Sequence, residues 1–226
     1  MTGDTTDYDL LLQEQLAIGL RQMQLDVPFA SQQKLVRYIT TLHKWNKTHN
    51  LTAIRNPEQM ISRHLLDSLS IAKFLDGKTL LDVGSGAGLP GIPLAIVKPH
   101  LNVTCLDSVL KKTRFMLFAA SALDLANVSV RHTRVESLKH ESGYDMIVAR
   151  AFSSIEKLCA VTEHLLSSQG RILAMIGKPL ETELSTGVVA VQLDSGSKFY
   201  VAGAEKLFVA GETAQRNIVI LQKNAV

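Results

Sequence analysis

The sequence predicts an α/β protein with a mainly parallel sheet and a helical N-terminal extension. A short apolar segment, 79–83, runs into a glycine-rich turn and then a helix that begins near Ile92. Through 103–176, short apolar segments alternate with helix-length segments. This alternation is typical of right-handed βαβ units whose helices cover both faces of the sheet. The first 75 residues instead carry apolar side chains at helical spacing.

Composition limits the class of protein without identifying its partner. The chain has 226 residues and a net charge of only +3, enough for one α/β domain with an extension. It contains no run near the ~20 apolar residues of a membrane span, and Met1–Asp9 is too polar for a signal peptide. Cys105 and Cys159 lie in apolar surroundings, which favours reduced thiols in a cytoplasmic protein. No cysteine or histidine cluster has the spacing of a metal site.

Three helices are predicted in the extension, residues 1–75, which packs on a core domain, residues 76–226. The first spans 10–25. The second has Ser31 as N-cap, and the chain leaves that helix over 43–52. The third begins with Asn56 as N-cap and Pro57 in the first position, and its apolar face continues to Leu75. No Ser/Gly/Pro-rich linker separates the two parts.

The core domain is expected to contain a seven-stranded sheet. After the strand at 79–83, the remaining strands are predicted at 103–106, 128–130, 145–150, 171–176, 188–193 and 218–221. Helices are predicted at 111–125 and 154–166, the latter closed by the polar segment 167–170.

The glycine-rich turn is a candidate cofactor seat. The dinucleotide pattern Gly-x-Gly-x-x-Gly places Leu89 at its third glycine, and a second match from Gly86 puts Pro90 inside the turn. The pattern that fits is Asp-x-Gly-x-Gly-x-Gly, formed by Asp82, Gly84, Gly86 and Gly88. A carboxylate before the turn suits a cationic ligand, and S-adenosyl-L-methionine carries an ammonium and a sulfonium. The alternative is a glycine-rich surface turn.

Polar residues follow the other strands, where ligands bind in such sheets. Asp107 is placed to hydrogen-bond ribose hydroxyls, and Val135 with Glu136 to hold adenine. Asp107 could instead cap the next helix, and Glu136 could be a solvated loop acid. Arg150 ends a buried strand and therefore needs a partner.

Positive charge gathers in the extension. Between residues 31 and 64 a single acid, Glu58, accompanies the cations Lys34, Arg37, Lys44, Lys47, Arg55 and Arg63. This imbalance fits either a patch that contacts RNA phosphates or an ordinary solvated helical face.

Several residue blocks, in order, resemble the ribosomal small-subunit RNA guanine-N7 methyltransferase family, also called the glucose-inhibited division protein B family. The resemblance covers roughly residues 35–178. Its blocks are Trp45-Asn46, Asn50-Leu51-Thr52, Arg63-His64, Leu66-Asp67-Ser68, the segment 82–93, Leu106-Asp107-Ser108 with Lys111-Lys112, Arg134-Val135-Glu136 and Arg150-Ala151-Phe152. One departure is Gly177-Lys178, which stands in the reverse of the family's usual order and puts a role for Lys178 in doubt.

The resemblance implies a Rossmann-like class I S-adenosylmethionine-dependent methyltransferase that acts on one guanine in the decoding-region loop of 16S ribosomal RNA. The expected cofactor contacts are Gly84, Leu89, Val135, Glu136 and Arg150. The candidate RNA contacts are Lys44, Lys47, Arg63, His64, Lys111 and Lys112. The partner would be the small ribosomal subunit or an assembly intermediate, bound by a monomer.

Guanine N7 is a lone pair without a proton, so its methylation needs positioning and no general base. Arg150 is therefore assigned to holding the ligand or the base, and Phe152 either stacks on the base or belongs to the core. Two other functions stay open: a small-molecule methyltransferase, and a non-catalytic RNA-binding module that retains the cofactor fold. The basic extension disfavours the first, and the intact loop with Asp107 and Glu136 disfavours the second.

Overall fold

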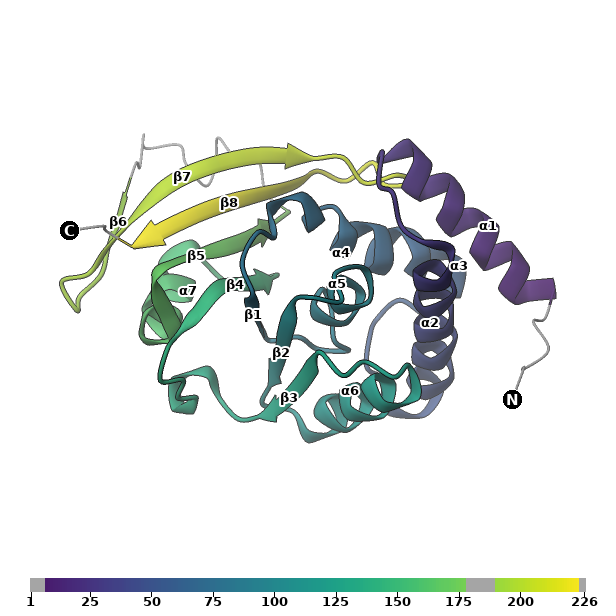
Figure 1. Ribbon diagram of the computed structural model, residues 1–226, viewed down its shortest axis with the longest axis horizontal. Helices are drawn as coiled ribbons and strands as arrows, with labels where there is room; N and C mark the ends of the chain where they lie inside the picture. The colour runs from purple at the N-terminus through teal and green to yellow at the C-terminus, as the bar shows by residue number, and fades with distance from the viewer. Residues whose placement is uncertain (1–6, 178–189, 224–226) are drawn as a thin grey trace.

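A mainly parallel sheet forms the centre of the computed structural model, which describes residues 7–177 and 190–223 (Figure 1). Within these residues the sheet has eight strands in the order β3-β2-β1-β4-β5-β8-β7-β6. They are β1 (Thr79–Val83), β2 (Asn102–Asp107), β3 (Val128–His132), β4 (Tyr144–Arg150), β5 (Leu166–Ile176), β6 (Ala190–Gln192), β7 (Lys198–Leu207) and β8 (Arg216–Lys223). Strands β1 to β5 pair in parallel, and β8, β7 and β6 add antiparallel pairs.

The sheet has one strand more than the seven expected. The missed strand is β7, which pairs with β8 along most of its length. Its sequence mixes glycine and charged side chains with apolar ones, and only Phe199 and Leu207 of its residues are buried. It therefore lacks the continuous apolar run that identified the central strands. The expected final strand at 218–221 is the middle of β8, while the first part of 188–193 and Lys178 lie outside the described residues.

Helices cover both faces of the sheet (Figure 1). On one face, α5 (Gly91–Val97) and α6 (Leu110–Ala122) share a core with the N-terminal helices. On the other face lies α7 (Ile155–Thr162), capped by Ser154, whose side chain accepts a hydrogen bond from Lys157 N. Alternate residues of β4 supply the two cores, with Met146 and Val148 on one side and Ile147 and Ala149 on the other. The segment 167–170 belongs to β5, so it does not end a helix as expected.

The first N-terminal helix lies three residues earlier than the sequence predicts, and the second is longer than predicted. Helix α1 is Asp7–Gln22 and α2 is Phe29–His49. Ser31 is not the N-cap: α2 begins two residues earlier, and Ser31 Oγ donates to Ile96 O at 3.3 Å, which joins α2 to α5. The helix also continues to His49 and ends at Asn50 in the left-handed conformation. Its last turns read as a loop because their polar residues face solvent while Asn46 packs inward.

The third predicted helix is broken into several pieces. Asn56 caps α3 (Pro57–Met60) by accepting from Glu58 N, as the sequence predicts. A π-helical turn η1 (Ile61–Leu66) follows, then α4 (Asp67–Leu69) and a 3-10 turn η2 (Ala72–Phe74). The π turn carries buried His64 toward the sheet, a placement typical of functional sites.

The extension and the sheet share one hydrophobic core, which contains buried side chains of α1, α2 and η1 together with strand residues. Among the residues that the structure describes, no helix has both the length and the apolar composition to cross a membrane.

Candidate active site

The glycine loop after β1 leaves open space where a ligand can lie against the backbone. Gly84, Gly86 and Gly88 have φ angles of +71°, +61° and +90°, which disfavour any residue with a Cβ. A Cβ built at Gly84 meets no atom within 4 Å, and one at Gly86 meets only Gly84 O at 4.0 Å. A Cβ at Gly88 would collide with Ile92. The first two glycines therefore border the seat, and the third lets the helix pack closely.

Backbone hydrogen bonds to β2 hold this loop in place. The N–H groups of Gly84 and Ser85 donate to Leu106 O at 2.9 and 3.0 Å. Ser85 Oγ accepts from Leu106 N at 3.0 Å, and Gly86 N donates to Asp107 Oδ2 at 2.9 Å. The structure thus brings together the loop and the acid at the end of β2, as the sequence predicts.

Asp82 supports the loop from below and does not line the open seat. It is fully buried, and its Oδ2 accepts from Gly91 N at 2.9 Å. Burial raises its pKa to about 6. Among the described residues Oδ1 has no hydrogen-bond partner, so an uncompensated acceptor remains beneath the loop. The expected direct contact with a cationic ligand is therefore corrected to a contact with the start of α5.

Tyr38 of α2 also holds the loop, a role that the helical periodicity did not reveal. Its hydroxyl donates to Ala87 O at 2.6 Å, and its ring is fully buried. Burial raises the Tyr38 pKa well above its usual value, which keeps the hydroxyl protonated as a donor. The extension therefore contacts the candidate cofactor seat directly.

The other expected cofactor residues lie at the same edge of the sheet. Asp107 is buried at the end of β2 and accepts from Val109 N, from Gly86 N and, at 3.4 Å, from Lys112 Nζ. Glu136 is exposed and Val135 half-buried in the short turn η3 (Val135–Ser137) after β3. The side chain of Leu89 is only 4% exposed and packs in the core, so only its backbone is available for a cofactor contact.

A cavity, the acceptor cleft, lies beside this seat where β4 and β5 end and β8 begins. Its volume is about 570 Å³, and its lining includes Thr52, Ile54, His64, Arg150, Met175 and Arg216. Strands β1 and β4 are neighbours, with Val83 opposite Ala149. Gly84 and Arg150, the next residue on each strand, therefore place the seat and the cleft side by side.

Asp67 is the buried partner that Arg150 needs. Arg150 Nη1 donates to Asp67 Oδ2 at 3.0 Å, and Arg216 Nε donates to Asp67 Oδ1 at 2.8 Å. The Asp67 side chain is 4% exposed, whereas each arginine side chain is 27% exposed. One buried carboxylate thus orients two guanidinium groups at the cleft. No motif assigns Asp67 a role in the site, and Arg216 was missed because nothing near it in the chain indicates a site.

His64, one of the candidate RNA contacts, is buried at the cleft and is not an exposed cation. It is 4% exposed, and its Nε2 lies 2.9 Å from Thr52 Oγ1. Burial, followed by the charge of Arg150, lowers its pKa to about 4. His64 is therefore neutral at pH 7.

Asn46 shapes the wall of the cleft formed by residues 51–54. Its Oδ1 accepts from Leu51 N at 2.7 Å and Thr52 N at 2.9 Å. Its Nδ2 donates to Thr52 O at 3.0 Å and Ile54 O at 3.2 Å. One buried side chain thus satisfies four backbone groups of this loop.

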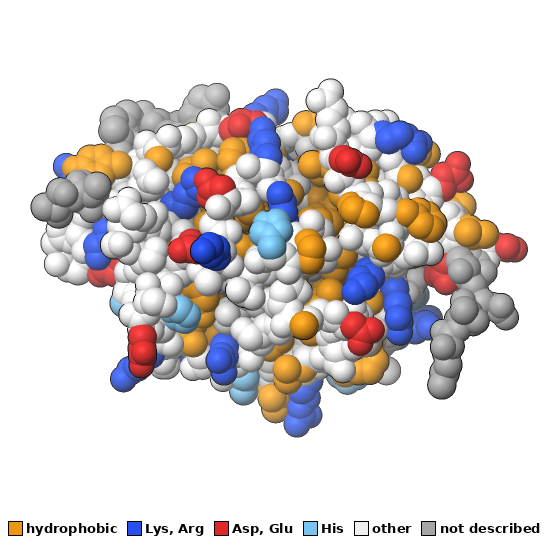
Figure 2. All heavy atoms as spheres, viewed as in Figure 1, with side chains coloured by type: hydrophobic (Ala, Val, Ile, Leu, Met, Phe, Trp, Pro, Cys, Tyr) orange, Lys and Arg blue, Asp and Glu red, His pale blue; other side chains and the backbone are white. Residues whose placement is uncertain are grey.

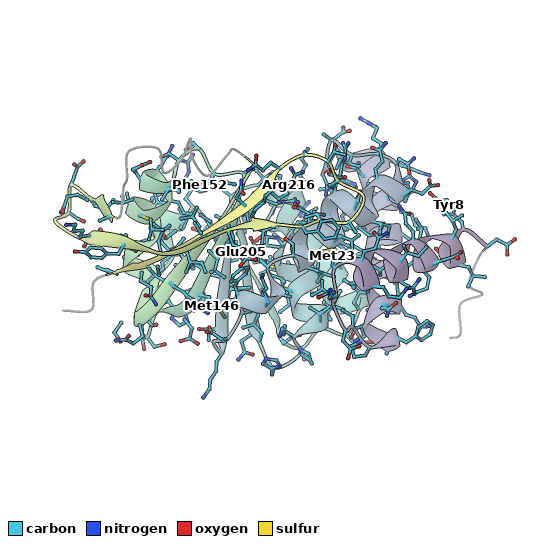
Figure 3. All side chains as sticks on the ribbon, turned by 90° about the horizontal axis from the view of Figure 1, so that it is seen from above. Tyr8, Met23, Met146, Phe152, Glu205 and Arg216 are labelled. Carbon is cyan, nitrogen blue, oxygen red and sulfur yellow. The ribbon has the colours of Figure 1, made fainter. Side chains whose placement is uncertain are left out.

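Phe152 does not share the cleft with Arg150. It is half-buried against the α7 side of the sheet, beside Ile155 and Leu158. Figure 3 shows Arg216 at the end of β8 next to the helical part of the molecule, and Phe152 farther toward α7. Between Arg150 and Phe152, Ala151 has a φ of +58°, which turns the chain away from the cleft. The core interpretation of Phe152 is thus the one that the structure supports.

The remaining candidate RNA contacts differ in availability. Lysine, arginine and acidic side chains are interspersed on the face in Figure 2. The ion pairs of each cation therefore show better than the overall charge which cations are available to bind RNA. Arg63 Nε pairs with Glu212 Oε1 at 3.3 Å, and Lys112 Nζ with Asp107 Oδ2 at 3.4 Å. Lys44, Lys47 and Lys111 are exposed and form no ion pair among the described residues.

Several solved structures that are similar to this one are named as methyltransferases or were solved with AdoMet bound. A S-adenosylmethionine-dependent methyltransferase from Aquifex aeolicus is similar with a TM-score of 0.53 and 16% identity, over 79% of this chain and 96% of that one. The TYW2 protein of M. jannaschii in complex with AdoMet has a TM-score of 0.51 and 13% identity, over 73% and 78%. The mainly parallel sheet with its glycine loop therefore has the Rossmann-like fold of class I methyltransferases.

Sequence comparison identifies the family. The model of the GidB family, described as rRNA small subunit methyltransferase G, matches residues 31–218. A relative of that name from Methylobacillus flagellatus is 45% identical over 210 residues, 93% of this chain and 98% of its own length. Another, from Pseudomonas syringae pv. tomato, is 42% identical over 212 residues, 94% and 97%. The chain therefore belongs to the GidB family of rRNA small subunit methyltransferases.

Proposed function

We propose that this protein transfers the methyl group of S-adenosylmethionine to N7 of a guanine in the decoding-region loop of 16S ribosomal RNA. The observation that carries the proposal is that open space over Gly84 and Gly86 lies next to the cleft beside Arg150. Methyl transfer requires the cofactor's carbon and the acceptor's lone pair to meet in line, and a ligand seat that adjoins a cleft favours such a meeting.

The cofactor seat fits S-adenosylmethionine through its shape and its acids. Gly84 and Gly86 leave room for a ligand against the backbone, Asp107 is placed for the ribose hydroxyls, and Glu136 stands at the end of β3 for the adenine. When bound, the cofactor supplies an electrophilic methyl group. The protein's part is to orient it and to exclude water.

The acceptor cleft suits a neutral purine nucleophile. His64 is uncharged there, so it does not oppose the positive charge that the base acquires as it is methylated, and Asp67 holds Arg150 in place. Arg150 positions the acceptor and takes up no proton, because guanine N7 has none to lose. The wall made by Thr52 and Ile54 bounds the cleft on the side of the extension.

Exposed Lys44, Lys47 and Lys111 supply the surface that holds RNA phosphates, with Arg63 and Lys112 in ion pairs nearer the cavities. We also keep the division into a helical extension, 1–75, and a methyltransferase domain, 76–226. A monomer in the cytoplasm, acting on the small subunit or its assembly intermediate, completes the proposal.

Nucleoside mass spectrometry tests the function. Small subunits from cells that lack this protein are incubated with the purified protein and methyl-labelled S-adenosylmethionine, and the RNA is digested and mapped. Labelled N7-methylguanosine at one position in the decoding-region loop is expected. Label in small molecules alone would point to a small-molecule methyltransferase, and RNA binding without any transfer would point to a non-catalytic module.

A further inference from the structure

We propose that Arg216 and Arg150 together bind a backbone phosphate of the nucleotide that carries the acceptor guanine, with Asp67 holding both guanidinium groups in place. The inference rests on the proposed function and adds to it a phosphate site and a residue, Arg216, that no motif identified. Both arginines lie at the mouth of the acceptor cleft, and their side chains are 27% exposed.

The hydrogen bonds within the cluster leave donors that point to a further acceptor. Arg216 donates through Nε to Asp67 and through Nη1 to Gln215 O. Arg150 donates through Nη1 to Asp67 and to Arg63 O. Within the described part of the chain, Arg216 Nη2 and Arg150 Nη2 donate no hydrogen bond. Each guanidinium is thus fixed on one side and keeps a donor on the other, which suits an anion shared between them.

The charge of the cleft also favours an anion. Three arginines, at positions 63, 150 and 216, face two carboxylates, Asp67 and Glu212, while His64 is neutral. Glu212 Oε1 is occupied by Ser62 Oγ at 2.8 Å and Arg63 Nε at 3.3 Å. Its Oε2 lies 4.0 Å from Arg216 Nη2, beyond hydrogen-bond distance. Glu212 therefore mainly neutralises Arg63, and the excess positive charge remains with Arg150 and Arg216.

The chemistry of the reaction favours a phosphate, rather than the edge of the guanine base, as the ligand of the two arginines. An arginine fork on guanine normally spans O6 and N7. Such a fork would occupy the N7 lone pair that must attack the methyl group, and its charge would oppose the positive charge that the purine acquires. A phosphate gives the second arginine a strong partner away from N7. It also anchors a nucleotide drawn out of its stack.

Arg216→Gln tests the assignment, with Arg216→Lys as the charge-preserving variant. Lys223→Gln is the matched control, since Lys223 lies at the other end of β8 and is also ion-paired, with Glu163 at 3.7 Å. Methyl transfer to small subunits is measured at several salt concentrations, and binding of S-adenosylmethionine by calorimetry. Guanosine and guanosine 3′,5′-bisphosphate are compared as competitive inhibitors, and thermal melting reports folding.

For Arg216→Gln we expect KM for the subunit to rise roughly 10-fold or more, and the salt slope to fall by about one phosphate contact, with cofactor affinity unchanged. The bisphosphate should inhibit the wild type better than guanosine does, and this preference should vanish in Arg216→Gln and return partly in Arg216→Lys. Equal inhibition by both compounds in the wild type, or a fall in kcat alone, would overturn the phosphate site. Failure of the proposed function is seen separately, as a wild type that does not methylate guanine N7.

Discussion

Gly86 combines a positive φ with empty space beside its Cα, and both properties favour a ligand at that position. We expect Gly86→Asp to abolish S-adenosylmethionine binding, because the new side chain enters the seat, strains the backbone and places a second carboxylate beside Asp107. Calorimetry should show at least a 100-fold loss of affinity, roughly 3 kcal/mol. Melting temperature serves as the folding control, and unchanged affinity in a folded variant would contradict the assigned seat.

His64 gives the protein a specific dependence of stability on pH. Its folded pKa of about 4 lies below its usual 6.5, so it favours the folded state above pH 6.5, and this stability is lost as the pH falls toward 4. The pKa of Asp82 is raised from 3.8 to about 6 in the folded state. Between pH 6 and 3.8 its contribution to the free energy of unfolding therefore increases as the pH falls, which is opposite to that of His64. Comparing wild type with His64→Gln cancels the contribution of Asp82.

Urea unfolding of both proteins between pH 4 and 7 should therefore show that the free energy of unfolding of the wild type declines more steeply with acid than that of His64→Gln. Parallel curves would mean that His64 titrates in the folded state as it does in water.

At the scale of elements, α2 ends by shaping one wall of the acceptor cleft through Asn46. Asn46→Ala would leave four backbone groups of residues 51–54 without their partner, at a cost of about 3 kcal/mol. We expect lower stability together with weaker methyl transfer. Trp45, the single tryptophan of the chain, lies next to Asn46 and reports unfolding by fluorescence.

A matched variant separates stability from the site. Asn127 likewise donates to three carbonyls, at Ala95, Lys98 and Leu101, in a different part of the molecule. Asn127→Ala should lower stability while its turnover at low temperature stays near that of the wild type. Equal loss of turnover in the two variants would show that stability alone explains the effect of Asn46.

The central elements could be predicted because each has a local signal. Strands β1, β2 and β4 are buried on both faces and read as apolar runs, and Asn56-Pro57 marks a helix start. β7 and the π turn could not be predicted, since they depend on pairing with β8 and on packing of buried polar groups. The same difference applies to the site: the glycine loop is one segment, whereas Arg216 meets Asp67 and Arg150 only in the folded chain.

At the scale of the whole molecule, Lys44 and Lys47 of α2 are exposed cations that form no ion pair among the described residues. Replacing both Lys44 and Lys47 with Gln should weaken binding to the small subunit and lower its salt slope by up to about two phosphate contacts, with cofactor affinity unchanged. Lys78 precedes β1 and Lys98 follows α5, so both lie at the end of the sheet away from the glycine loop. Replacing these two lysines with Gln is the matched control. An unchanged slope for the α2 variant would identify these lysines as an ordinary solvated face.

The hydroxyl of Tyr38 on Ala87 O makes the N-terminal helices and the glycine turn parts of one unit. Replacing the N-terminal helices is therefore expected to disturb the cofactor seat as well. A chimera in which another substrate-recognition module replaced residues 1–75 would lose the Tyr38 hydrogen bond that holds the glycine turn. Retargeting to a new RNA therefore calls for grafting exposed side chains onto α2 and keeping the helix itself.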